Sequence, residues 1–116
     1  MASLNMSGPY NLDKETTDQQ VTRTSPGNYA LGKKNDEGTF LVGYVGRSDS
    51  DVNARLKSWV GNTARPLFKY SYANSAKAAF EKECENYHDF DPPVNEAHPD
   101  RPDGSGWKCP RCDIFD

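Results

Sequence analysis

The sequence contains no apolar run long enough to cross a membrane, and no hydrophobic segment near its start that would act as a signal peptide. We therefore expect a cytoplasmic protein with no membrane partner. Large apolar residues are also scarce, because hydrophobic types make up 34% of the 116 residues. A core built from so few residues is small, so we expect one domain with loosely packed ends.

Cysteine is rare in this sequence, with three residues: Cys84, Cys109 and Cys112. An odd number of cysteines disfavours a disulfide framework, so we expect reduced thiols or metal ligands. An excess of basic residues is missing too, since the formal net charge is −3. This balance argues against a strongly basic nucleic-acid clamp, although a local basic groove is compatible with it.

Composition divides the chain into three parts. Residues 1–25 are mostly Ser, Asn, Thr, Asp and Gln, with few large apolar side chains, which predicts a disordered or extended segment. Residues 26–95 carry the hydrophobic periodicity of a folded domain. Residues 96–116 are rich in Pro and Gly and predict an irregular C-terminal extension, which something other than secondary structure must order.

The central part has the pattern of a small α+β domain. Apolar residues alternate in residues 28–32, 39–45 and 67–72, which predicts three strands. Helical periodicity predicts one helix at about 51–60 and a second that begins near residue 75 and ends before Pro92. The order is β-β-α-β-α, so we expect a small three-stranded antiparallel sheet flanked by helices.

A glutamate lies where the second of these helices should face the core. Glu83 falls in the middle of an apolar stripe, whose other members are Ala76, Phe80, Tyr87 and Phe90. Burying an unpaired carboxylate would cost several kcal/mol. Three interpretations follow: the helix is rotated slightly, Glu83 forms an ion pair with an arginine such as Arg55, or it is a metal-binding carboxylate at the floor of an active site.

Short motifs on the predicted elements resemble those of a known nuclease family. They occur in chain order as Gly27-Asn28-Tyr29, Tyr44-Val45-Gly46, Arg55, Glu83 and Pro92-Pro93-Val94-Asn95. Each fragment alone is weak, but five elements in the right order on suitable predicted elements are a strong signal. Residues 27–95 therefore resemble the GIY-YIG nuclease domain, which is found in homing endonucleases and in the incision subunit of bacterial nucleotide-excision repair.

The resemblance implies an endonuclease that hydrolyses one phosphodiester strand of DNA with a single divalent ion, Mg²⁺ or Mn²⁺. Glu83 would bind the ion, because hydrated Mg²⁺ needs only one or two protein carboxylates. Arg55 would offer its planar donors to the phosphate, and Arg47 could do the same. Tyr29 and Tyr44 would orient or deprotonate the attacking water. The second role would require nearby cations, such as Arg47, to lower the phenol pKa.

Two further positions bear on the implied site. Asn95 would fix the backbone or the water shell of the metal. Trp59 stands where the family often has His or Tyr, and an indole cannot act as an acid or base at neutral pH. The alternative is therefore a catalytically inactive domain of this fold that binds nucleic acid or a protein. Either function would need a partner for targeting, since no separate DNA-binding domain is visible in the sequence.

The cysteines predict a second metal site. Cys109 and Cys112 have the spacing of a zinc knuckle, and structural zinc takes four ligands. Cys84 and His88 lie one helical turn apart and could supply the other two. His98 is the substitute if His88 faces away. The alternative is an unliganded extension with reduced thiols.

Overall fold

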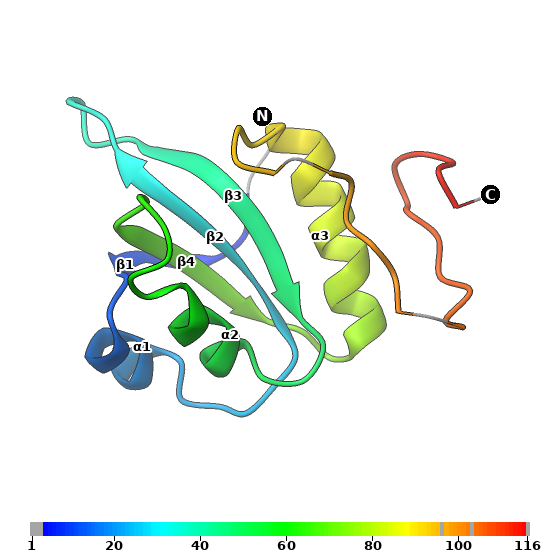
Figure 1. The fold of residues 1–116 in the computed structure, drawn as a ribbon, viewed down its shortest axis with the longest axis horizontal. Helices are drawn as coiled ribbons and strands as arrows, with labels where there is room; N and C mark the ends of the chain where they lie inside the picture. Colours follow the sequence, from blue (N-terminus) through cyan, green and yellow to red (C-terminus); the bar gives the residue numbers. More distant parts are fainter. Residues whose placement is uncertain (1–3, 96, 103, 116) are drawn as a thin grey trace.

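The computed structural model describes residues 4–95, 97–102 and 104–115. The other positions, which belong to the predicted N-terminal segment and C-terminal extension, lie outside the described residues. A four-stranded antiparallel sheet with the order β1-β4-β2-β3 forms the centre of the fold (Figure 1). Its strands are β1 (Ser7–Asn11), β2 (Gly27–Lys34), β3 (Phe40–Ser48) and β4 (Leu67–Tyr72). The α+β class expected from the sequence is confirmed, with four strands in place of the predicted three.

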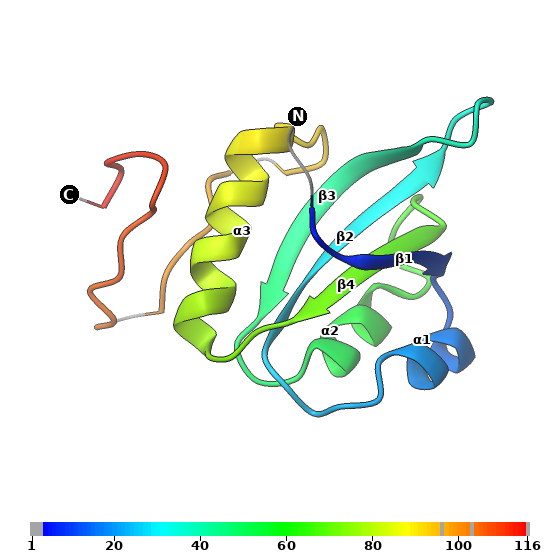
Figure 2. The same cartoon turned by 180° about the vertical axis from the view of Figure 1, so that it is seen from behind.

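Helices cover both faces of this sheet (Figures 1 and 2). One face packs against α2 (Val52–Trp59) through a core that includes Tyr29, and α1 (Lys14–Gln20) lies beside α2. The other face packs against α3 (Ala76–Phe90), with Ala30 beneath it. Successive strand residues point to opposite faces, which is why Tyr29 and Ala30 lie in different cores.

Local signals set both ends of α3, the helix that carries Glu83. Ser75 caps its start, because the Ser75 side chain accepts a hydrogen bond from the Ala78 N–H at 3.1 Å. The helix ends at Asp91, whose φ of 42° is left-handed, directly before Pro92. Neither α3 nor any other helix of the described residues has the length and apolarity needed to span a membrane.

The N-terminal segment is folded within the described residues, which corrects part of the prediction for residues 1–25. β1 is extended, as expected, but α1 is a helix that the sequence did not indicate. α1 has no apolar stripe, because its only buried residue is Thr17. Flanking groups order it instead: Val21 is 2% exposed in the core, and the Tyr70 hydroxyl donates to the Gln20 carbonyl at 2.7 Å.

The C-terminal extension has no helix or strand in its described residues, as predicted, and runs alongside α3 (Figures 1 and 2). Its aromatic side chains pack against the outer side of that helix. The ring of Phe80 lies 5.9 Å from that of Trp107 and 5.8 Å from that of Phe115, measured between centroids. A small second cluster on α3 therefore orders the extension in place of secondary structure.

We expect Val21→Ala to lower the free energy of unfolding by about 2 kcal/mol, because two buried methyl groups leave a cavity in the core. Thr24→Ala, at an exposed position in the same segment, should change it by less than about 0.5 kcal/mol. Urea unfolding followed by circular dichroism measures both values. A Val21→Ala variant as stable as the wild type would show that this segment does not contribute to the core.

Candidate active site and metal cluster

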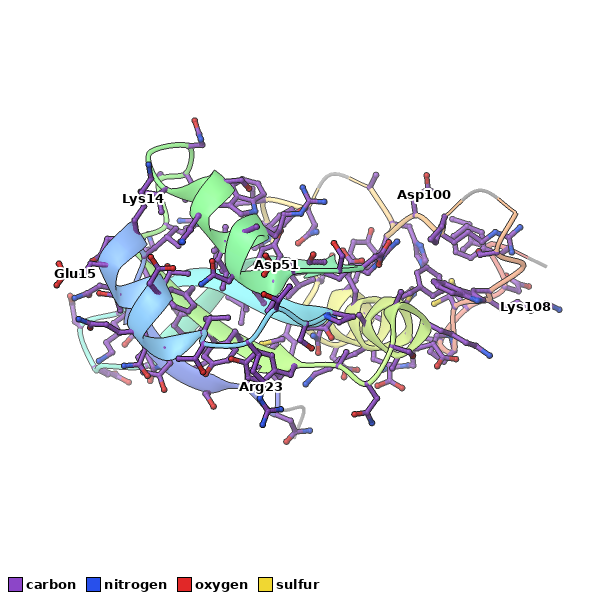
Figure 3. The ribbon with its side chains drawn as sticks, turned by 90° about the horizontal axis from the view of Figure 1, so that it is seen from below. Lys14, Glu15, Arg23, Asp51, Asp100 and Lys108 are labelled. Atoms are coloured by element: carbon purple, nitrogen blue, oxygen red, sulfur yellow. The ribbon has the colours of Figure 1, made fainter. Side chains whose placement is uncertain are left out.

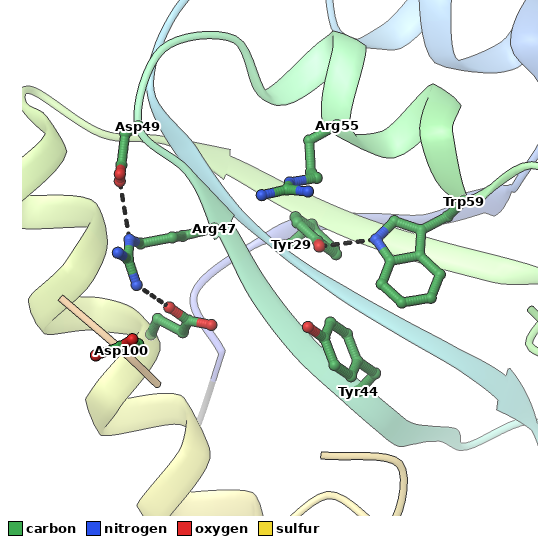
Figure 4. Close-up of a pocket in the computed structure, with 8 residues that line it drawn as sticks. Tyr29, Tyr44, Arg47, Asp49, Arg55, Trp59 and Asp100 are labelled. Carbon is green, nitrogen blue, oxygen red and sulfur yellow. Dashed lines mark hydrogen bonds and ion pairs between the residues drawn. The ribbon is translucent and has the colours of Figure 1, made fainter. Parts of the chain in front are cut away.

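A cavity of about 260 Å³ lies beside β3, at the edge of the sheet (Figure 4). Its lining residues are Tyr29, Tyr44, Arg47, Asp49, Arg55, Trp59, Glu83 and Asp100. They come from β2, β3, the loop after β3, α2, α3 and the C-terminal extension. Of the residues that the sequence predicts for catalysis or phosphate binding, all but Asn95 line this cavity.

The cavity joins side chains from opposite faces of the sheet. Tyr29 and Tyr44 belong to the core on the α2 face. Arg47 lies on the α3 face, where its guanidinium carbon is 5.1 Å from the centroid of the Phe80 ring. In a central strand, neighbouring strands would keep these two sets of side chains apart. Because β3 is the last strand of the sheet in the described part of the chain, they meet around its outer edge.

Gly46 lets the Tyr29 side chain reach this edge. The two residues are cross-strand partners, and a Cβ on Gly46 would overlap the Tyr29 ring and hydroxyl. The Trp59 indole N–H donates a hydrogen bond to the same hydroxyl at 2.8 Å, and the Trp59 ring packs against Tyr44 with centroids 4.9 Å apart. Trp59 therefore acts as a donor that fixes Tyr29.

Both phenols of the cavity are protonated at neutral pH. Burial raises the pKa of Tyr29 well above its ordinary value, and the hydrogen bond from Trp59 offsets only part of that rise. Burial, followed by the charge of Glu83, raises the pKa of Tyr44. Since Trp59 donates to Tyr29, the Tyr29 proton is free to be donated in turn to an acceptor in the cavity. The geometry suits phenols that orient a water and do not deprotonate it.

Glu83 is 7% exposed and forms an ion pair with Arg47, at 2.6 Å between Oε1 and Nη1. The Nε of the same guanidinium pairs with Asp49 at 2.8 Å. Burial raises the pKa of the Glu83 carboxyl, and the interaction with Arg47 opposes that rise. The ion pair with an arginine that one interpretation of Glu83 expects is thus present, with Arg47 in place of Arg55. Its other oxygen, Oε2, has no hydrogen-bond partner among the described residues.

The two arginines of the cavity differ in their availability. Arg47 is held by Asp49 and Glu83 together. Arg55 projects from α2 toward the cavity, and its guanidinium has no ion pair or hydrogen bond with any described residue (Figure 4). An anion that enters the cavity would therefore find Arg55 available as a partner, whereas Arg47 would first have to release a carboxylate.

Asn95 acts on the backbone, which is one of the two roles expected for it. Its side-chain amide accepts from the Val45 N–H at 2.9 Å and donates to the Val45 carbonyl at 3.0 Å. The neighbouring Val94 N–H donates to the Gly43 carbonyl at 2.8 Å. These bonds hold the outer edge of β3 on both sides of Tyr44. Asn95 is therefore a positioning residue for the cavity.

Asp100 is a lining residue that the sequence did not indicate. It belongs to the C-terminal extension, two residues after His98, and lies on the Arg47 side of the cavity (Figure 4). Its carboxylate accepts from the Arg101 N–H at 2.9 Å. An aspartate in a Pro-rich segment carries no signal of its own. Only the packing of the extension against α3 brings it to the cavity.

Four metal-ligating side chains gather between α3 and the extension. Figure 3 shows the extension beside α3, with Asp100 and Lys108 on its course. The ligand atoms of His88, His98, Cys109 and Cys112 all lie within 4.8 Å of one another. His98 Nε2 is 3.3 Å from His88 Nε2 and 3.4 Å from Cys112 Sγ. Two sulfurs and two imidazoles match the donor set of a tetrahedral metal site, so these residues could hold an ion such as Zn²⁺.

The Cys109 thiol is disposed to ionise. Burial alone would raise its pKa. Three hydrogen-bonding neighbours oppose burial: the Arg111 backbone N–H, 3.4 Å from Sγ, and the side chains of His98 and Cys112. Together they lower the pKa of Cys109 to about 6. The thiolate is the form in which cysteine binds metals, so the local hydrogen bonds favour ligation.

The predicted ligand set is corrected at Cys84, whose place His98 takes. Cys84 is fully buried in one cluster with Phe80 and Cys109. Burial, followed by the neighbouring Cys109 thiol, raises the pKa of Cys84, so it stays a protonated thiol. Helical spacing places Cys84 and His88 on one flank of α3. It does not reveal that Cys84 is buried among aromatic side chains and so is not one of the four ligands.

We expect Gly46→Ala to lower the free energy of unfolding by about 1–3 kcal/mol, because the new Cβ displaces the Tyr29 ring and its hydrogen bond with Trp59. Gly43→Ala on the same strand is the matched control. There the Cβ would meet only the flexible end of Arg65, so the cost should be much smaller. Urea unfolding compares the two variants, and equal stabilities would contradict the close approach of Tyr29.

Comparisons of the chain with models of known protein families, with curated proteins and with solved structures found no match. The likeness to GIY-YIG nucleases rests on the motifs in the sequence. The functional proposal rests on those motifs together with the geometry of the cavity.

Proposed function

We propose that this protein is a GIY-YIG-like endonuclease that hydrolyses phosphodiester bonds of DNA with one divalent ion, Mg²⁺ or Mn²⁺. The observation that supports this most is the single cavity at the edge of β3. It unites two phenols, a buried carboxylate and an arginine that is unpaired among the described residues. A place for an anion thus lies beside a place for a cation, which is the arrangement that metal-assisted phosphodiester hydrolysis requires.

Glu83 fits the role of ion ligand. Its burial fixes its position, and its Oε2 is free of hydrogen bonds with the described residues. Mg²⁺ keeps several of its waters and needs only one or two protein carboxylates. When bound, the ion stabilises the negative charge that develops on the phosphate oxygens. Arg47 holds the other oxygen of Glu83 and so orients the carboxylate.

The remaining groups position the substrate and the water. Arg55 binds the phosphate through the planar fork of its guanidinium. Trp59 fixes the Tyr29 hydroxyl, whose proton is then directed toward an acceptor in the cavity. Tyr44 packs against Trp59 and presents its hydroxyl to the same space. The raised pKa values of both phenols make them orienting groups at neutral pH.

One observation supports a second candidate function. The ion pair with Arg47 compensates the charge of Glu83 that a divalent ion would need. A domain in which this pair persists would bind nucleic acid through Arg55, or a protein partner, without cleaving anything. In either case a separate protein would be needed to target the domain, because the cavity offers few cations for an extended contact with DNA.

We infer further that Zn²⁺ binds to His88, His98, Cys109 and Cys112 as a structural ion. Four protein ligands complete a tetrahedral site and leave no position for water or substrate. The described part of the extension has no helix or strand of its own. The ion would hold it against α3.

With Mg²⁺ or Mn²⁺, the wild type should nick supercoiled plasmid DNA, and Glu83→Gln and Arg55→Ala should each lower the rate by about a hundredfold or more. Glu85→Gln, exposed on the same helix, and Arg23→Ala, outside the cavity, should keep it. Gel electrophoresis of relaxed and supercoiled plasmid measures the rates. Undiminished nicking by Glu83→Gln would contradict the mechanism. A wild type that binds nucleic acids but cleaves none would favour the binding module.

The purified protein should contain about one equivalent of zinc. His98→Ala and Cys112→Ser should lose the metal, whereas Cys84→Ala should retain it, because Cys84 does not belong to the set of four ligands. Inductively coupled plasma mass spectrometry of the purified proteins gives the metal content. If Cys84→Ala lost the zinc while His98→Ala kept it, the ligand set expected from the sequence would be restored.

A further inference from the structure

We propose that Asp100, carried by the C-terminal extension, is a second protein carboxylate of the divalent-ion site at Glu83. This inference rests on the proposed endonuclease function and deepens it. The ion would be held from two parts of the chain, α3 and the C-terminal extension, which meet at the His/Cys cluster and at the aromatic contacts of Phe80. Both carboxylates line the same cavity.

The starting observation is the environment of Glu83. The residue is 7% exposed, yet its Oε2 has no hydrogen-bond partner within the described residues. Taking a carboxylate out of water is costly unless each oxygen finds a partner. Arg47 satisfies Oε1 alone, and Oε2 is not among the fully buried atoms, so a water or a cation in the cavity can meet it.

The charges around the cavity favour the cation even with Arg55 counted, because the lining carries three carboxylates against two guanidiniums. Arg47 is compensated by Asp49 and Glu83 together. Asp100 accepts one hydrogen bond, at Oδ1 from the Arg101 N–H, and its Oδ2 has none in the described part of the chain. Two carboxylates therefore each line the cavity with an uncommitted oxygen. That is the number of protein carboxylates that Mg²⁺ or Mn²⁺ uses alongside waters and substrate phosphates.

Residues that flank Asp100 in the sequence fix the position of the extension on both sides of it. On one side, His98 belongs to the metal cluster, and its ring packs against Phe115 with centroids 5.6 Å apart. On the other side, the Arg101 guanidinium donates to the Trp107 carbonyl at 2.6 Å and stacks on Phe115, 4.7 Å from the ring centroid. A metal ion on His98 would therefore also fix the position of Asp100 at the cavity.

The inference is tested by the affinity of the zinc-loaded protein for Mn²⁺, measured from free Mn²⁺ by electron paramagnetic resonance. Asp100→Asn should lower this affinity about tenfold or more, as the loss of one ligand carboxylate does. Asp36→Asn, in the turn between β2 and β3, is the matched control and should bind Mn²⁺ like the wild type. Both variants should keep their zinc.

A second arm tests the coupling to the cluster. Cys112→Ser removes a cluster ligand far along the extension, and it should lower Mn²⁺ affinity to a similar degree, because it releases Asp100. The double variant Asp100→Asn/Cys112→Ser should then lose little more than either single variant. Additive losses would contradict the coupling.

The outcomes separate this inference from the proposed function. If Glu83→Gln weakens Mn²⁺ binding but Asp100→Asn leaves it unchanged, the role of Asp100 is overturned while the ion site at Glu83 stands. If the wild type binds no Mn²⁺ at all, or binds it equally well without Glu83, the ion site itself fails and the role of Asp100 fails with it.

Discussion

The candidate site depends on the ion pair between Glu83 and Arg47. Glu83 lies on the inner side of α3, where an unpaired carboxylate would destabilise the fold, and the guanidinium of the edge strand compensates it at 2.6 Å. Arg47 is fixed in turn by Asp49 and by the Phe80 ring. One interaction thus stabilises the contact between sheet and helix and orients a carboxylate toward the cavity. It also means that an incoming cation competes with a guanidinium for the charge of Glu83.

α3 connects the two candidate metal positions. Its inner side presents Glu83 to the cavity, and its outer flank presents His88 to the extension. Phe80 lies between them, in contact with Arg47 on one side and with Trp107 on the other. The helix is therefore shared by two clusters of different chemistry, oxygen ligands on one side and nitrogen and sulfur ligands on the other.

Periodic signals predicted the elements that carry the cavity, and tertiary contacts decided the rest. The apolar stripe of α3 and its capping residues are local properties, so the position of Glu83 on the buried side follows from the sequence. α1 has no such stripe and is ordered by residues that flank it. The metal cluster shows the same limit, because spacing indicates that Cys109 and Cys112 converge but not that His98 joins them. Asp100 reaches the cavity only through the path of an irregular segment, for which no periodicity exists.

The hydrogen bonds that Val94 and Asn95 make with β3 have a consequence beyond the cavity. An outermost strand normally exposes unpaired amide and carbonyl groups, onto which a strand of another molecule can add. Here the Gly43 carbonyl and both backbone groups of Val45 are already occupied, by one main-chain N–H and one side-chain amide. The asparagine amide thus takes the place of a peptide group and blocks intermolecular β-pairing at the middle of the outer edge of β3. This edge can therefore stay exposed without becoming a site of aggregation.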